Sequence, residues 1–253
     1  MKLIIYGLIY IIGTLFGSFF SLAVYRIPIK QSIMHGRSYC PKCNHRLNFL
    51  DLIPVFSYIF LGGKCRYCKE KIRIRYICLE ILSGIVFLIF SLSLKIDLFN
   101  LEISKIIYLV FGILFISTLF LIGGIEKENH YISKPVLLFG LILEVIYIIY
   151  LYILKMNRYK YAIYLFIMCA LLVFNNLLFK KRKQVTYIID ILILYLFIAI
   201  FVKEELVILS ITLVTILSLL KYIQNKKIPV GFYICCINIV MMITQSFICS
   251  YFK

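Results

Sequence analysis

The sequence predicts an all-α polytopic membrane protein with about eight transmembrane helices and a small cysteine-bearing module between the first two. Hydrophobic residues make up 63% of the 253 positions, and only eleven residues are Asp or Glu. Apolar runs of about 18 residues or more recur along the chain, which is the length that a helix needs to cross the hydrocarbon core of a bilayer. This composition excludes a soluble globular domain.

Eight apolar segments are expected to span the membrane, each of roughly 17–25 residues. They cover about residues 3–24, 76–94, 105–124, 135–154, 160–179, 185–202, 206–222 and 229–250. The first is too long for a signal peptide and lacks a small-residue cleavage site, so it is expected to be retained. The sixth and seventh are separated only by Lys203-Glu204-Glu205, which leaves a seven-span arrangement as the alternative.

The distribution of Lys and Arg predicts the orientation of the spans. Twenty of these residues fall on one side, eleven of them in residues 26–75, and eight fall on the other side. Because positively charged loops stay in the cytoplasm, the 26–75 segment is expected to be cytoplasmic and both termini to lie outside. Topology therefore accounts for the net charge of +17 without nucleic acid, and the lipid bilayer is the expected surrounding.

Four cysteines in the 26–75 segment have the spacing of a metal site: Cys40 and Cys43 form one CxxC pair, and Cys65 and Cys68 form the other. Two such pairs suit a tetrahedral four-cysteine zinc site. The alternatives are four unrelated cysteines or two disulfides, and a reducing cytosol disfavours the disulfides. Four sulfurs leave no open position for a catalytic water, so the zinc is expected to hold the fold of the module.

The expected domains follow from these features. Residues 1–25 form the first transmembrane helix, 26–75 the cytoplasmic four-cysteine zinc module, and 76–253 a membrane-embedded helical domain. Between the two cysteine pairs, residues 49–58 are apolar and broken by a proline. This stretch is expected either to lie along the membrane surface or to pack under the cysteine pairs.

Carboxylates in or beside the spans are functional candidates, because a charge within a bilayer is costly. Glu126 closes the third span and Asp190 lies near the start of the sixth, so both are expected near the cytoplasmic face. Two acids that meet there can act as general base and general acid, as in aspartic proteases. The alternatives are a solvated loop acid at Glu126 and a locally satisfied helix residue at Asp190. Glu80 and Glu144 are expected to pair with basic residues or hydroxyls of neighbouring helices.

Several short motifs occur along the chain in a characteristic order. They are Gly17-Ser18-Phe19, Tyr25-Arg26-Ile27-Pro28, the two cysteine pairs with Asp51-Leu52-Ile53-Pro54-Val55 between them, Ile74-Arg75-Tyr76, Leu79-Glu80 and Lys227-Ile228-Pro229-Val230-Gly231. Together these motifs resemble the type IV prepilin peptidases, a family of aspartic proteases of the bacterial plasma (inner) membrane. The resemblance is dense over residues 13–84 and thin over 135–220.

The resemblance implies a function and a site. The family cleaves the leader of type IV prepilins and pseudopilins on the cytoplasmic side, and many members then methylate the new N-terminus with S-adenosylmethionine. The family's two catalytic aspartates align with Glu126 and Asp190, so the first is replaced by Glu. Tyr187 and Ile189 stand where the glycines of the family's GxGD motif are expected. No glycine-rich nucleotide loop is found, so methylation rests on the resemblance alone.

The sequence therefore supports three hypotheses for the function. The leading hypothesis is a prepilin leader peptidase that uses Glu126 and Asp190 in an aspartic-type mechanism. The second is a catalytically impaired member of the family that binds prepilins or the assembly machinery without cutting. The third is a small proton-coupled transporter with an intramembrane relay through Glu80, Glu144 and Asp190, which leaves the cysteine pairs unexplained.

Overall fold

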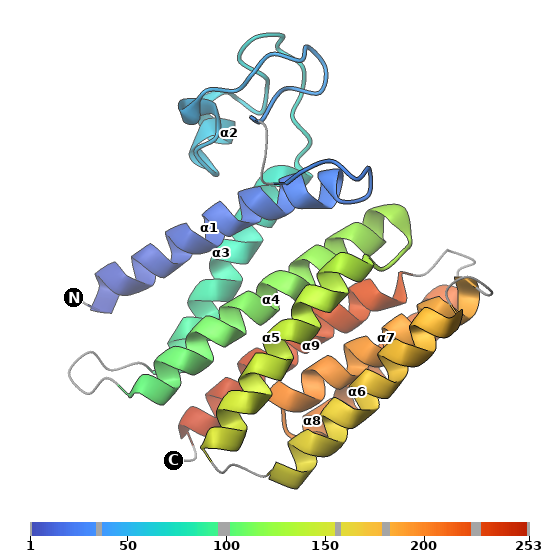
Figure 1. The fold of residues 1–253 in the computed structure, drawn as a ribbon. Helices are drawn as coiled ribbons and strands as arrows, with labels where there is room; N and C mark the ends of the chain where they lie inside the picture. The colour runs from blue at the N-terminus through green and yellow to red at the C-terminus, as the bar shows by residue number, and fades with distance from the viewer. Residues whose placement is uncertain are drawn as a thin grey trace. The chain divides into compact units, whose positions relative to one another are not determined.

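The computed structural model describes residues 2–33, 37–95, 102–154, 158–178, 183–223 and 229–251. Eight long helices account for most of these residues, and no β-strand occurs among them (Figure 1). The long helices are α1 (Lys2–Arg26), α3 (Arg75–Ser93), α4 (Ile103–Asn129), α5 (Lys134–Ile153), α6 (Arg158–Leu178), α7 (Lys183–Phe201), α8 (Glu204–Ile223) and α9 (Val230–Tyr251). The predicted all-α fold is confirmed.

Within the described residues, five helices are long and apolar enough to cross a membrane: α1, α3, α4, α5 and α9. Shorter apolar stretches lie in the other three, at Lys160–Leu171, Tyr187–Phe201 and Glu205–Leu219. Because α7 ends at Phe201 and α8 begins at Glu204, the sixth and seventh predicted segments form separate helices. The expected sides of the membrane stay a prediction, and Lys180-Lys181-Arg182 and Lys226-Lys227-Ile228 lie outside the described residues.

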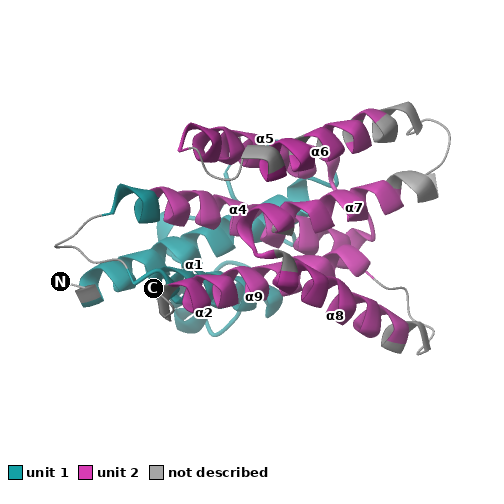
Figure 2. Cartoon of the chain, turned by 90° about the horizontal axis from the view of Figure 1, so that it is seen from below, with its two compact units in different colours: residues 1–106 teal, residues 107–253 magenta. Residues whose placement is uncertain are grey.

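The chain divides into two compact units, residues 1–106 and 107–253 (Figure 2). Unit 1 contains α1, α3 and, between them, the four-cysteine segment with a short 3-10 helix, η1 (Phe49–Asp51), and one turn of helix, α2 (Phe56–Phe60). Unit 2 contains most of α4 and all of α5 to α9.

In unit 1, small residues let α1 and α3 approach closely. A Cβ atom added to Gly13 would lie 2.7 Å from the Cα of Gly84, and one added to Gly17 would lie 2.6 Å from the Cα of Glu80. The Ser83 hydroxyl also donates a hydrogen bond to the Gly13 carbonyl of α1, at 2.7 Å. Without a hydrophobic driving force between helices in lipid, such close backbone packing is a main source of association. The Gly17 motif therefore has a structural role at this contact.

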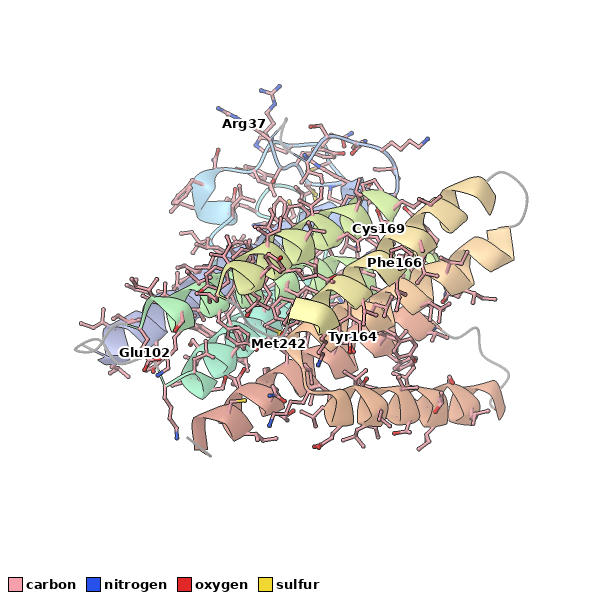
Figure 3. The ribbon with its side chains drawn as sticks, turned by 60° about the horizontal axis from the view of Figure 1, so that its bottom comes forward. Arg37, Glu102, Tyr164, Phe166, Cys169 and Met242 are labelled. Carbon is pink, nitrogen blue, oxygen red and sulfur yellow. The ribbon has the colours of Figure 1, made fainter. Side chains whose placement is uncertain are left out.

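In unit 2, aromatic side chains build much of the core. Phe115 of α4 and Phe197 of α7 are almost completely buried, and Phe201 of α7 stacks on Phe115 and Tyr147 with ring centroids 4.5 and 5.0 Å apart. Other aromatic side chains face outward, as Phe166 of α6 does (Figure 3). The aromatic residues are thus divided between helix contacts and outward-facing surface.

Candidate functional site

The four cysteines of the predicted zinc site lie together in unit 1. Their sulfur atoms are all within 4.8 Å of one another, and the Sγ atoms of Cys40 and Cys68 are 3.8 Å apart. Zinc–sulfur bonds of about 2.3 Å in a tetrahedron require sulfurs roughly 3.8 Å apart, so the donor set fits one ion. None of the nine cysteines, all of which are described, is in a disulfide. The cluster can therefore hold a metal ion such as zinc.

The two CxxC loops repeat one backbone pattern. In each, the N–H of the first cysteine donates to a carbonyl five residues on, from Cys40 to His45 at 3.0 Å and from Cys65 to Glu70 at 2.8 Å. The residue after each second cysteine turns the chain through a positive φ, 56° at position 44 and 60° at position 69. Such values are uncommon outside glycine. Their recurrence at the same place in both loops supports two equivalent half-sites facing one centre.

Charge within the cluster also favours a cation. Burial disfavours the Cys40 thiolate, but hydrogen bonds from the backbone N–H groups of Cys43 and Lys42 outweigh this effect, and the pKa of Cys40 is lowered to about 7. At Cys68 the backbone N–H of Glu70 favours the thiolate, but burial and the neighbouring thiols raise its pKa to about 12. Four thiolates this close repel one another, and a metal ion removes that repulsion.

The segment between the CxxC loops is attached to the second of them through Asp51. The Asp51 carboxylate forms an ion pair with the guanidinium of Arg66 at 2.7 Å and accepts a hydrogen bond from the Tyr67 hydroxyl at 3.1 Å. The Tyr67 ring stacks on His45 with centroids 3.6 Å apart. His45 is thus a stacking partner, and it is not among the clustered ligands.

Glu80 of α3 holds the other end of this segment. Its Oε2 accepts a hydrogen bond from the backbone N–H of Val55 at 2.7 Å, and the Ser18 hydroxyl of α1 also interacts with it. Val55 has a φ of 64°, which is strained for a β-branched residue. The expected pairing of Glu80 with a hydroxyl of a neighbouring helix is confirmed, and Glu80 also fixes the path of the module.

In unit 2, the carboxyl of Glu126 is completely buried near the end of α4. Its Oε1 accepts hydrogen bonds from the Tyr187 hydroxyl of α7 at 2.5 Å and from the backbone N–H of Gly231 at 3.0 Å. The alternative of a solvated loop acid is therefore wrong. Three helices, α4, α7 and α9, meet at this one carboxyl group.

The first turn of α9 is shaped around that carboxyl. A Cβ atom at Gly231 would collide with Oε2 of Glu126, so only glycine fits this position without a shift. The N–H of Phe232 also interacts with the carboxyl. Unpaired N–H groups and the helix dipole make a helix N-terminus a binding site for negative charge. The sequence placed Gly231 only within a motif and gave Tyr187 no role, since neither contact has a local signal.

Asp190 is also buried, with 4% of its surface exposed, and it follows Tyr187 by one helical turn. Residues three apart lie on the same face of a helix, so Asp190 shares the face of α7 that reaches Glu126. Lys134 at the start of α5 interacts electrostatically with Asp190. The pairing of Glu126 with Asp190 itself stays a prediction.

Glu144 departs from expectation. It is completely buried in the middle of α5, and neither of its carboxyl oxygens has a hydrogen-bond partner among the described residues. The expected pairing with a basic residue or hydroxyl is therefore wrong within this part of the chain. The carboxyl lies instead among the apolar helix contacts of unit 2.

Comparisons with known proteins point to one family. The model of the bacterial peptidase A24 N-terminal domain matches residues 11–94, which include α1, the four-cysteine module and α3. A prepilin leader peptidase/N-methyltransferase of Myxococcus xanthus is 38% identical over 79 residues, 31% of this chain and 24% of that protein. A protein of the same name from Bacillus subtilis is 31% identical over 135 residues, 53% of this chain and 51% of that protein.

The matched stretches are partial. A third relative of the same name, from Vibrio cholerae, is 38% identical over 79 residues, which are 28% of this chain and 31% of that protein. The chain thus spans between about a quarter and a half of the length of these relatives. No solved structure matches the chain. Both Glu126 and Asp190 lie beyond residues 11–94, so the family match does not reach them.

Proposed function

We infer that this chain belongs to the type IV prepilin peptidase family, whose N-terminal domain it matches, and we propose that it is a membrane-embedded prepilin leader peptidase. The proposed substrates are prepilins or pseudopilins, cut at the cytoplasmic face of the bacterial plasma membrane. Apolar helices suited to a membrane and the names of the relatives support this proposal.

The carboxyls of Glu126 and Asp190 are the proposed catalytic pair. The observation that carries this proposal is the buried Glu126 carboxyl, held by Tyr187 one turn before the buried Asp190. In the proposed reaction, one carboxylate takes a proton from water as the water oxygen adds to the scissile carbonyl. The other carboxyl, protonated, gives its proton to the leaving amide nitrogen, and the peptide C–N bond breaks.

Tyr187 is proposed to position Glu126. By resemblance, Glu126 replaces an aspartate and Tyr187 replaces the first glycine of the GxGD motif. Glu extends the carboxyl by one methylene, about 1.5 Å of chain. The Tyr187 hydroxyl and the Gly231 N–H both bind the carboxyl there. The two differences from the family pattern are thus complementary, because the Tyr187 hydroxyl holds the longer side chain of Glu126 in place.

The proposals of a zinc ion and of S-adenosylmethionine rest on different observations. A structural zinc ion held by Cys40, Cys43, Cys65 and Cys68 is supported by the spacing of their sulfurs. Zinc would supply a cross-link between the two CxxC loops and no open site for chemistry. Methylation of the new N-terminus with S-adenosylmethionine is proposed from the names of the relatives alone.

Cleavage of a co-expressed prepilin tests the proposal. Glu126→Gln and Asp190→Asn should each reduce processing by about 100-fold or more, since each removes a general acid or base. Glu128→Gln is the matched control, because it removes an acid two residues away on the same helix. If both catalytic-site variants cleave as well as wild type, the catalytic acids lie elsewhere.

A second function, binding of prepilins without cleavage, is favoured by the closed state of Glu126. Its carboxyl is completely buried and already hydrogen-bonded through Oε1. A binding protein should capture uncleaved prepilin from detergent extracts, equally well as wild type and as Glu126→Asp. A large gain of cleavage in Glu126→Asp would instead identify an impaired peptidase.

A further inference from the structure

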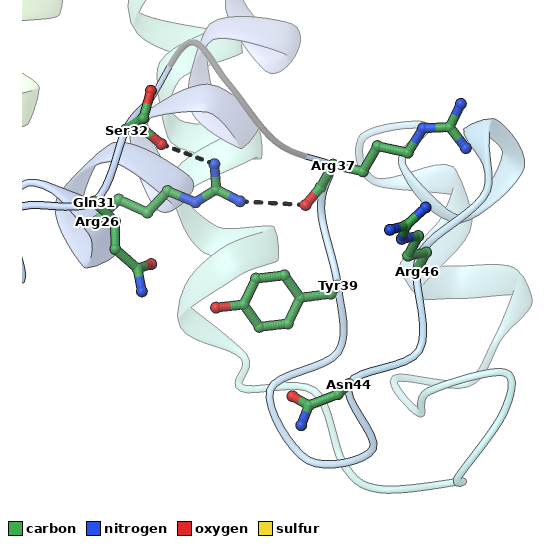
Figure 4. Close-up of a pocket in the computed structure, with 7 residues that line it drawn as sticks. All are labelled: Arg26, Gln31, Ser32, Arg37, Tyr39, Asn44 and Arg46. Atoms are coloured by element: carbon green, nitrogen blue, oxygen red, sulfur yellow. Dashed lines mark hydrogen bonds between the residues drawn. The ribbon is translucent and has the colours of Figure 1, made fainter.

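A wide pocket lies in unit 1 where α1 ends, and it has no part in the proposed cleavage (Figure 4). Its volume is about 730 Å³. Three arginines line it, Arg26, Arg37 and Arg46, and no acidic residue is among its described lining residues. The ring of Tyr39 and the side chain of Asn44 lie on its wall, below the guanidinium of Arg26 in the view of Figure 4.

Arg26 is a charged group built into the wall. Only 5% of its surface is exposed, and its guanidinium donates hydrogen bonds to the backbone carbonyls of Ser32 at 3.0 Å and Arg37 at 3.3 Å. These neutral acceptors orient the guanidinium without cancelling its charge. Burying a cation is costly unless a counter-charge is near, so a pocket of this kind favours an anion.

The arginines suit one ligand chemistry. A guanidinium presents a planar fork of N–H donors that matches phosphate and carboxylate oxygens, and the exposed Arg37 and Arg46 line the same pocket as Arg26. Figure 3 shows Arg37 extending away from the ribbon. We propose that this pocket is an anion site for a phosphate group, and that the phosphate belongs to the headgroup of an anionic phospholipid.

The position of the pocket favours a lipid source. Arg26 is the last residue of α1, and Arg75 is the first of α3, so both ends of the module leave helices suited to a membrane. Residues 26–75 carry eleven Lys and Arg but only two acids. Clusters of basic residues beside a transmembrane helix attract anionic lipid, by about 1 kcal/mol for each residue near the surface.

The same module exposes apolar side chains that a bilayer interface would cover. Phe49 of η1 is 82% exposed, and Phe56 and Phe60 of α2 are 62% and 84% exposed. These exposed side chains agree with the expectation that the stretch lies along the membrane surface, which stays a prediction, while Asp51 attaches the same stretch to the second CxxC loop. Exposed aromatic residues and a cationic pocket in one module suit both parts of a phospholipid, its acyl region and its headgroup.

A fluorescent reporter in the pocket tests the site. The chain has no tryptophan, so Tyr39→Trp places a single indole in the pocket wall. The full chain, in a neutral detergent, is titrated with short-chain phosphatidylglycerol, short-chain phosphatidylcholine and inorganic phosphate. Phosphatidylglycerol should give a saturable change in emission at lower concentration than the other two. Native mass spectrometry of the unsubstituted protein, counting bound phosphatidylglycerol, checks that the reporter has not altered the site.

Variants that remove single charges distinguish a specific phosphate site from general electrostatic attraction of anionic lipid to the module. Arg37→Gln and Arg46→Gln in the reporter should each weaken phosphatidylglycerol binding about tenfold, as expected for loss of one hydrogen bond to a charged group. Arg73→Gln is the matched control, because it removes the same charge from the same module outside the pocket, and it should change affinity by less than about twofold.

Three results would overturn parts of this proposal. If inorganic phosphate binds as tightly as phosphatidylglycerol, the anion site stands and its lipid source fails. If Arg73→Gln weakens binding as much as Arg37→Gln, the attraction is diffuse and there is no site. If neither the reporter nor native mass spectrometry detects saturable phosphatidylglycerol binding, the proposal fails entirely. None of these results depends on prepilin cleavage.

Discussion

Substitution of Gly17 by alanine tests the close packing of α1 on α3. The added Cβ would lie 2.6 Å from the Cα of Glu80 and 2.7 Å from the carbonyl oxygen of Leu79. Ordinary contacts of a Cβ atom start near 3.4 Å, so the helices must separate by almost 1 Å at this point. The Ser83 hydroxyl lies closer still and can turn aside, but the two backbone atoms cannot.

The cost can be estimated from this separation. A gap of about 0.5–1 Å forfeits a quarter to a half of the dispersion energy of each contact that it opens, and overpacking of this kind typically costs about 1–3 kcal/mol. Alanine recovers about 1 kcal/mol through its higher helix propensity. We therefore expect a net destabilisation of up to about 2 kcal/mol, seen as a lower midpoint of thermal unfolding followed by circular dichroism in detergent.

Gly7→Ala is the control for this prediction. Gly7 lies on the same helix, but a Cβ atom there would meet nothing within 4 Å. Only the propensity gain remains, so this variant should be unchanged or more stable by up to about 1 kcal/mol. If the two variants shift the midpoint in the same direction and by the same amount, close approach of the helices is not what holds them together.

Three further predictions concern the other contacts. Cys65→Ser should abolish bound zinc, measured by elemental analysis of purified protein, whereas Cys78→Ser, outside the cluster, should leave one ion per chain. Tyr187→Phe should lower kcat for prepilin cleavage by about 10–100-fold with little change in KM, because one hydrogen bond to the Glu126 carboxyl is lost; equal kcat would exclude a positioning role. Glu80→Ala should speed limited proteolysis of residues 49–60, because the backbone N–H of Val55 loses its hydrogen-bond acceptor. Glu80→Gln keeps an acceptor and should be cleaved more slowly than Glu80→Ala.

The features that the sequence predicted well are those with a local pattern. Length and hydrophobicity located all eight long helices, and the break at Lys203 separated α7 from α8. The spacing of the CxxC pairs predicted a four-cysteine cluster, and the four sulfur atoms do lie within 4.8 Å of one another. In these cases the residues that make the structure are adjacent in the sequence, or follow a spacing that one ion requires of its ligands.

Contacts between distant residues were predicted poorly. Tyr187 and Gly231 lie 61 and 105 residues from Glu126, and nothing in their neighbourhood indicates that they bind its carboxyl. The resemblance even counted Tyr187 as a missing glycine. The prediction for Glu144 was wrong for a related reason. A carboxyl in an apolar segment predicts a hydrogen-bond partner on another helix, and the described residues supply none. Which side chains meet across helices depends on how the helices rotate, and that is set by packing along their whole length.

The repeated backbone of the two CxxC loops has a consequence for biosynthesis. Since each loop supplies two sulfurs, the first half-site can hold an ion firmly only after residue 68 has left the ribosome. An ion that closes the site would then join residues 40 and 65 and would shorten the free chain between α1 and α3. A shorter tether raises the effective concentration of one helix near the other. Metal capture would thus be timed to the moment just before α3 emerges to meet the glycine face of α1.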